Sequence, residues 1–259
     1  MAALRNSWLL LLGLCAASCG STGGKLITIG FRAGGVSRAA SGPLTFSITD
    51  PTTKKVIWTV TLQTARVGLG PFYFNAESPP TAAFRGGTVI IQATEQVIVD
   101  PLDPALKSVP GGADGETGPS LVCEIDLFPP PQSVVIGYVS GVATNGTTSV
   151  PFAGPIAINP NLVTPEQPLV AWERVNGAAA VLSFTADTQE VDLRVDPSHW
   201  FDSADFSALL GSAPVAGVYG WDPSNCNANS LDSARCTFQN AVLSGVRATI
   251  GVYQFSVVP

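Results

Sequence analysis

The sequence predicts an all-β protein, an antiparallel β-sandwich of the immunoglobulin-like or jelly-roll-like kind with one or two short helices. Short runs in which apolar and polar residues alternate recur along the chain, as in strands that bury one face. Glycine and proline, 26 and 21 of the 259 residues, separate these runs as turns do. Helical patterns are few, which favours packed sheets over a helical fold. We expect residues 26–259 to form a single sandwich domain, with residues 160–168 as the place where it could divide.

The first half of this expected domain holds the clearest strand pattern. Residues 56–64 alternate, so that Trp58, Val60 and Leu62 fall on one face and mostly polar residues fall on the other. The Gly70-Pro71 pair then predicts a break in the strand. The runs that we interpret as strands in this half are residues 26–32, 44–49, 56–64, 72–74, 88–99 (one bent strand or two) and 121–127, with a Pro-, Gly- and Asp-rich loop at 100–120.

The second half combines strands with the two helix candidates. Asn145-Gly146 is a strong hairpin signal between strands at 133–143 and 148–152. Residues 180–185 and 190–195 predict a second hairpin, and 253–257 a last strand. A helix at 197–210 is indicated by Asp196 as N-cap with proline at the first helical position, and 238–247 could form another.

The composition excludes several functional classes. The chain has 13 basic and 19 acidic residues, so the basic patch expected of a nucleic-acid-binding protein is missing. Only 12% of the residues are charged and glycine is abundant, which excludes a long coiled coil. The content of large apolar residues excludes intrinsic disorder of the whole chain. A single histidine leaves little room for a histidine-based triad or a His-rich metal site. Neither the G-x-S-x-G hydrolase pattern nor a P-loop or dinucleotide fingerprint occurs.

The N-terminus has the features of a bacterial lipoprotein signal. Arg5 precedes an apolar run at 8–17, and small residues then lead to Cys19. This pattern predicts a signal peptide at 1–18, a diacylglyceryl-modified Cys19, and a flexible tether completing residues 19–25. Gly20, where aspartate would retain the protein at the inner membrane, predicts sorting to the outer membrane. The alternative is an ordinary cleaved signal with a chance cysteine.

Three further cysteines lie in the expected body. We predict a disulfide between Cys226 and Cys236, which flank a polar loop in a compartment where disulfides persist, although three cysteines allow three single bridges. Closing this loop would stabilise the fold by roughly 2–3 kcal/mol. Cys123 shares a face with Ile125 and Leu127, which predicts a buried free thiol and not a nucleophile.

Two segments contain residues that could ligate a metal. In the first, Asp196, His199 and Asp202 could provide ligands or an aspartate-tuned imidazole, whereas the simpler interpretation is a helix cap beside core aromatics. In the second, oxygen-bearing side chains alternate as in calcium loops, although such residues also favour turns. The members of this second segment are Asp222, Asn225, Asn227, Asn229 and Asp232. The carboxylates of the 100–120 loop, from Asp100 to Glu116, are interpreted as a solvated surface.

Aromatic residues divide by pattern into core and candidate surface. The spacing of Trp58 and of Trp200 relative to neighbouring apolar residues predicts that both side chains are buried. Trp172 and Trp221 lie beside loops and are candidates for an exposed surface that binds a glycan or a protein.

Several short motifs together resemble those of one family. They are WTVTL at 58–62 with AR at 65–66, GPFYF at 70–74, GETGP at 115–119, GVA at 141–143, VPF at 150–152, VDP at 195–197, WF at 200–201, DF at 205–206 and GVR at 245–247. In order and spacing the chain resembles a group of uncharacterised envelope lipoproteins of Gram-negative bacteria. The resemblance implies a secreted, lipid-anchored β domain. Some members carry several histidines between the third and fourth strands, which implies divalent metal binding, but residues 97–103 here contain none.

We therefore expect a non-enzymatic, lipid-anchored protein of the cell envelope with a binding or structural role at the outer membrane. Its expected partners are the membrane, through the lipid, and an envelope protein or a glycan, but not nucleic acid. No cofactor besides the covalent lipid is expected. One alternative is a metal-binding lipoprotein that holds Ca²⁺, copper or Zn²⁺ in the acidic and Asx-rich segments. Another is a glycan-active enzyme, which needs two placed carboxylates.

Overall fold

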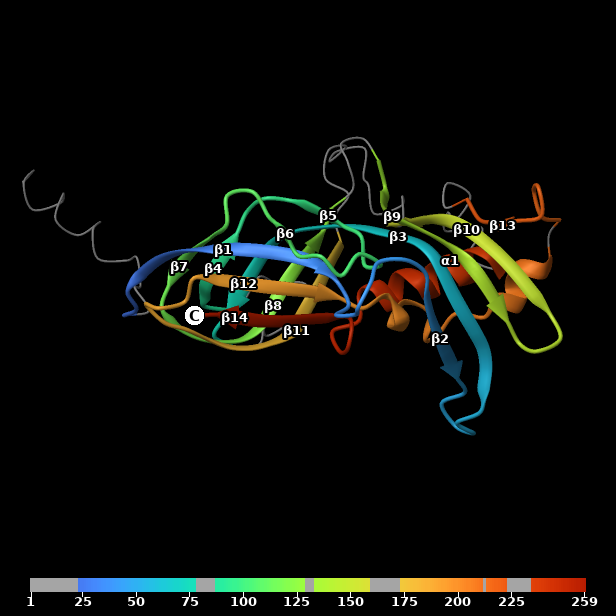
Figure 1. Ribbon diagram of the computed structural model, residues 1–259, viewed down its shortest axis with the longest axis horizontal. Helices are drawn as coiled ribbons and strands as arrows, with labels where there is room; N and C mark the ends of the chain where they lie inside the picture. Colours follow the sequence, from blue (N-terminus) through green and yellow to red (C-terminus); the bar gives the residue numbers. More distant parts are fainter. Residues whose placement is uncertain (1–22, 78–86, 129–132, 159–172, 212, 223–233) are drawn as a thin grey trace, which may run out of the picture.

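The structure is a computed structural model that describes residues 23–77, 87–128, 133–158, 173–211, 213–222 and 234–259 (Figure 1). Strands dominate these residues and helices are few, so the prediction of an all-β fold is confirmed. The strands form one large mixed sheet with a sandwich-like arrangement. None of the described helices is long and apolar enough to cross a membrane.

One half of the elongated molecule, which we call the sandwich half, contains both ends of the described chain (Figure 1). Its two layers meet in an aromatic core, in which the ring of Phe31 lies 4.7 Å from that of Phe72, and Phe74 lies 5.3 Å from Phe255. Its strands are β1 (Leu26–Gly35), the second part of β3 (Val56–Asn75), β4 (Val89–Ala93), β5 (Val97–Val99), β6 (Lys107–Ser108), β7 (Ala113–Glu116), β8 (Gly118–Leu127), β11 (Glu173–Phe184), β12 (Glu190–Val195) and β14 (Tyr253–Val258).

Strand β1 contributes to both layers of the sandwich half. Its first residues pair antiparallel with β7, whereas residues from Gly30 to Gly35 pair parallel with β12, which in turn pairs antiparallel with β14. The sandwich begins at Lys25, whose backbone N–H donates to the Thr117 hydroxyl at 2.8 Å and whose carbonyl accepts from the Thr117 N–H at 2.8 Å. The first strand is thus secured at its N-terminal end.

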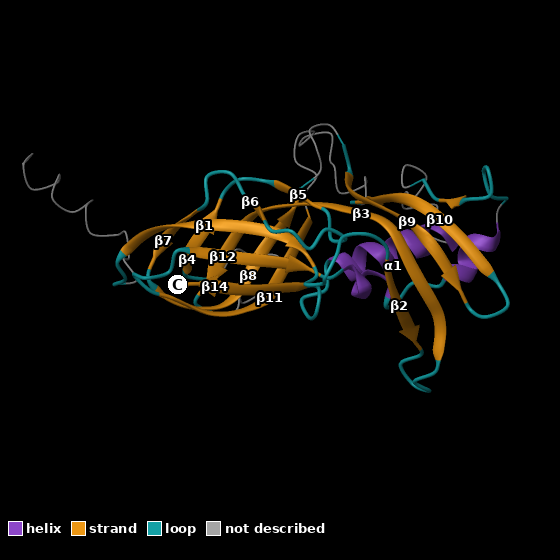
Figure 2. Ribbon diagram, viewed as in Figure 1, coloured by secondary structure: helices purple, strands orange, loops and turns teal. Residues whose placement is uncertain are grey.

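The other half, which we call the helix-covered half, is a sheet with helices on one face (Figure 2). The predicted Asn145-Gly146 hairpin is confirmed here, with the Asn145 side chain accepting from the N–H groups of Thr147 and Thr148. Its elements are β2 (Leu44–Thr49), the first part of β3, β9 (Val135–Thr144), β10 (Ser149–Ala157), β13 (Tyr219–Gly220), the 3-10 helices η2 (Pro197–Phe201) and η3 (Phe206–Gly211), and α1 (Ala234–Val246).

Strand β3 joins the two halves. It runs without interruption for 20 residues, so the two strands predicted at 56–64 and 72–74 are one, and the break predicted at Gly70-Pro71 is wrong. This pair is instead a cis peptide inside the strand, at a register shift in the pairing of β3 with β8. Gly70 has a φ of +107°, which glycine adopts without a side-chain clash.

Two further predictions about elements are wrong for identifiable reasons. The helix expected at 197–210 is two 3-10 helices, because Asp205 accepts from the Ser207 N–H at 2.9 Å and so starts a second turn. The hairpin expected from 180–185 and 190–195 does not form, because β11 pairs with β8 in one layer and β12 pairs with β1. The sandwich is mostly antiparallel, but the β1–β12 and β10–β13 pairings are parallel.

Other predicted elements are confirmed with shifted ends. Strand β2 coincides with its prediction, the run at 88–99 is two strands, and the 238–247 helix begins four residues earlier. The loop at 100–120 contains β6, β7 and the start of β8, because its residues complete ladders with β1 and β4.

Candidate functional site

The predicted cluster around the only histidine is used mainly for local structure. Asp196 caps η2 as predicted, accepting from the Ser198 N–H at 2.9 Å. His199 Nδ1 and Asp202 Oδ2 lie 2.9 Å apart, and both side chains are exposed. A Cβ atom on Gly251 would come within 2.7 Å of His199 Nε2, so the other ring nitrogen lies against a backbone turn. Within the described ranges, no three His, Cys, Asp or Glu side chains come together as metal ligands. A metal role here remains a prediction.

The predicted calcium loop and disulfide can be placed only in part. Asp222 is described and exposed, and Cys236 is buried on α1. The remaining predicted residues lie outside the described ranges, so calcium binding, the disulfide and the lipid on Cys19 remain predictions. These residues are Cys19, Trp172, Asn225, Cys226, Asn227, Asn229 and Asp232.

The carboxylates of the 100–120 loop serve separate contacts. Asp103 accepts from the Lys107 ammonium at 2.9 Å and from the Ala105 N–H, and these hydrogen bonds lower the pKa of its carboxyl. Asp114 accepts from the Thr28 hydroxyl at 2.6 Å, and Asp100 from the Leu102 N–H at 2.9 Å. Each of these three carboxylates therefore stabilises a different turn or strand.

The prediction that Trp221 is exposed is wrong. Only 5% of Trp221 is accessible, its Nε1–H donates to the Pro155 carbonyl at 2.6 Å, and its ring packs where a Cβ on Gly154 would be. The glycine provides the space that the indole fills. Trp58 and Trp200 are buried, as predicted.

Cys123 is a buried free thiol, as predicted. Burial raises the pKa of its thiol well above the ordinary value, and the nearby charges of Glu124 and Asp126 add to the effect. A thiol that stays protonated is a poor nucleophile, so Cys123 belongs to the core and not to a reactive site.

The sequence did not indicate a buried charge cluster formed by Arg174 of β11 with Glu124 and Asp126 of β8. Their exposed fractions are 6%, 2% and 4%, respectively. Arg174 Nε lies 2.7 Å from Asp126 Oδ1, and Nη1 lies 3.2 Å from Glu124 Oε2. Both faces of β8 are thus buried from Cys123 to Leu127, whereas alternation had indicated one apolar and one solvated face. The cluster secures the end of β8, which leads directly into Phe128.

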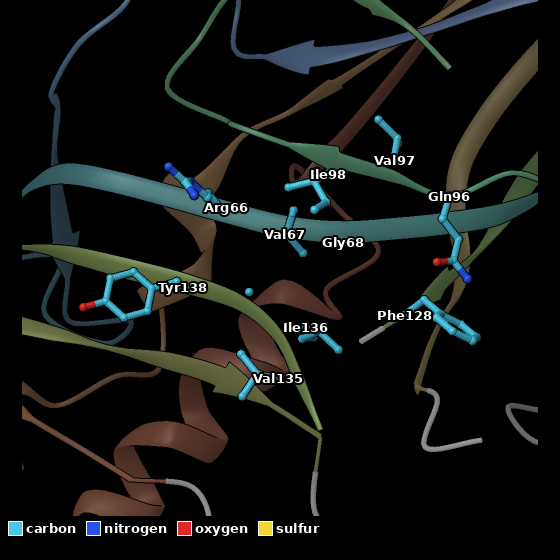
Figure 3. A pocket seen from close by; sticks show the side chains of 11 residues that line it. Arg66, Val67, Gly68, Gln96, Val97, Ile98, Phe128, Val135, Ile136 and Tyr138 are labelled. Atoms are coloured by element: carbon cyan, nitrogen blue, oxygen red, sulfur yellow. The ribbon is translucent and has the colours of Figure 1, made fainter. Parts of the chain in front are cut away.

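A cavity of about 460 Å³ lies where β3 passes from one half to the other (Figure 3). We call it the junction cavity. Strand β5 pairs with β3 on one side of it, β9 pairs with β3 on the other, and the Phe128 N–H donates to the Gly68 carbonyl at 3.3 Å. Its lining is predominantly apolar, and its volume falls in the range of small-molecule sites. It is lined by Arg66, Val67, Gly68, Gln96, Val97, Ile98, Phe128, Val135, Ile136, Gly137 and Tyr138.

The rim of the junction cavity combines exposed apolar groups with one cation. Ile98 is 71% exposed and Tyr138 44% exposed. Arg66 and Tyr138 are register partners on β3 and β9. Ile98 and Tyr138 occupy positions where the alternation of their strands predicts polar residues that face solvent. These two apolar residues are the sequence signal that could have indicated this site.

No protein-family model matches the chain, and no curated protein is similar to it at a significant level. Among solved structures, MbnP from Methylosinus trichosporium is 9% identical, with 91% of this chain and 99% of that chain covered at a TM-score of 0.31. At this TM-score the likeness supports no inference about fold or function.

Proposed function

We propose that the chain is a lipid-anchored, non-catalytic binding protein of the bacterial cell envelope and that the junction cavity is its ligand site. The cavity is the observation on which the binding role depends. Its described lining offers apolar surface, one cation, one phenol and one amide, and neither a carboxylate nor a thiol. Such a lining is suited to holding an apolar group and lacks a pair for acid–base chemistry.

Replacing Ile98 with aspartate is expected to weaken binding of the neutral apolar fluorophore N-phenyl-1-naphthylamine at least tenfold. The substitution places a charge where the ligand must remove water, and tenfold corresponds to about 1.4 kcal/mol. The measurement is a fluorescence titration of the purified chain. Val181→Asp, on an exposed valine of β11 outside the cavity, is the matched control and should bind as the wild type does. Equal binding of the fluorophore by the wild type and by Ile98→Asp would show that the cavity is not the ligand site.

Replacing Cys19 with serine is expected to move the protein from the membrane fraction to the aqueous fraction and to abolish incorporation of labelled palmitate. Serine has no thiol to receive the diacylglyceryl group, and none of the described helices is long and apolar enough to cross a membrane. Cys15→Ser is the control, because this upstream cysteine lies within the predicted signal peptide, and it should leave both results unchanged. Membrane retention of the Cys19→Ser chain would contradict the proposed anchor.

A further inference from the structure

We infer that the ligand of the junction cavity is an amphipathic anion, whose carboxylate, sulfonate or phosphate binds Arg66 and Tyr138 while its apolar body lies along the cavity. This inference rests on the proposed binding function and specifies the class of ligand.

Two of the three polar side chains in the lining stand together at one end of the cavity. Arg66 and Tyr138 lie at one end of the view in Figure 3, with Gln96 and Phe128 at the other and Ile98 between them. Register partners on adjacent antiparallel strands present side chains on the same face, about 4.5–5.5 Å apart at Cβ. The Tyr138 hydroxyl points away from the cavity in Figure 3. Both side chains are exposed and leave the same face, so rotation about their side-chain torsions can bring the guanidinium and the hydroxyl to one anionic group.

The charge of Arg66 is available to a ligand. Within the described ranges the Arg66 guanidinium makes no ion pair or hydrogen bond. By contrast, Arg32 is paired with Glu190 and Asp192, and Arg194 donates to two backbone carbonyls. Glu95 and Asp100, the carboxylates nearest in sequence to β5, do not line the cavity.

The energetics favour an anion over a neutral ligand of the same shape. The Arg66 guanidinium is solvated while the junction cavity is empty of ligand. An anion that displaces water from the cavity attracts this guanidinium more strongly, because the effective dielectric constant is then lower. Charge-assisted hydrogen bonds from arginine to a carboxylate or sulfonate are roughly twice as strong as neutral ones. A cavity of about 460 Å³ admits one ring system or a short chain and excludes a folded partner.

The test compares two probes of nearly the same shape, the anionic 8-anilinonaphthalene-1-sulfonate and the neutral N-phenyl-1-naphthylamine. Arg66→Gln should weaken binding of the sulfonate about tenfold and change binding of the neutral probe less than twofold. Arg66→Lys should retain much of the sulfonate affinity, because the positive charge remains. Added salt should weaken sulfonate binding in the wild type more than in Arg66→Gln. Unfolding midpoints check that each variant is folded.

The outcomes separate the two proposals. One outcome is that Ile98→Asp weakens binding of the neutral probe but Arg66→Gln leaves sulfonate binding unchanged. The cavity is then a ligand site, and the inferred anion specificity is wrong. If Arg66→Gln weakens both probes equally, Arg66 acts through packing, and the inference is also wrong. If neither probe binds the wild type, the binding function itself fails.

Discussion

Replacing Arg174 with methionine is expected to lower the free energy of unfolding by about 3–5 kcal/mol at neutral pH. The substitution removes the guanidinium that pairs with Glu124 and Asp126 and leaves these two carboxylates buried beside each other. Two buried like charges that have lost this cation disfavour the folded state. Urea unfolding monitored by circular dichroism measures the loss.

Arg32→Met provides the matched control for Arg174→Met. Arg32 also faces two carboxylates, Glu190 at 2.8 Å and Asp192 at 2.9 Å, but the side chains are 33%, 23% and 13% exposed, respectively. Solvent screens ion pairs of this kind, so Arg32→Met should lose much less stability than Arg174→Met. Both variants remove one guanidinium from between two carboxylates, so the difference between them measures the effect of burial.

Replacing Phe206 with alanine is expected to cost about 3–5 kcal/mol of unfolding free energy. Phe206 is fully buried, and its ring lies 5.6 Å from Trp58, 5.0 Å from Phe152 and 5.1 Å from Phe238. It therefore joins η3 to the sheet and to α1 at once, and its removal leaves a void that three separate elements would have to fill.

Leu210→Ala, four residues further along η3, is the control for Phe206→Ala. Leu210 is exposed, so its truncation should change the unfolding free energy by about 0.5 kcal/mol. Equal losses from the two variants would show that η3 itself, and not the aromatic cluster, limits stability.

The features that the sequence predicted correctly are those determined by neighbouring residues. Strand β2 follows from alternation, the β9–β10 turn from Asn145-Gly146, and the start of η2 from Asp196 next to a proline. In each case the atoms that stabilise the element lie within a few residues of one another, so local pattern is sufficient.

The junction cavity and the charge cluster could not be predicted in this way. Arg66, Ile98 and Tyr138 come from three strands whose pairing depends on registers that alternation does not specify. Glu124 and Asp126 follow the pattern of a solvated face, and only the pairing of β8 with β11 brings Arg174 to them. Trp221 is buried because Gly154, distant in sequence, provides the space.

The attachment of Lys25 to Thr117 limits how far from the bilayer the proposed anchor lets the cavity move. Five residues separate Cys19 from Lys25, a reach of at most about 22 Å. Strand β1 then runs about 30 Å to Gly35, whose N–H donates to the Asp103 carbonyl just beyond β5. The junction cavity thus lies about one strand length from the tethered end of the body. The tether and the strand together thus set an upper limit of roughly 50 Å on the distance between the cavity and the proposed lipid.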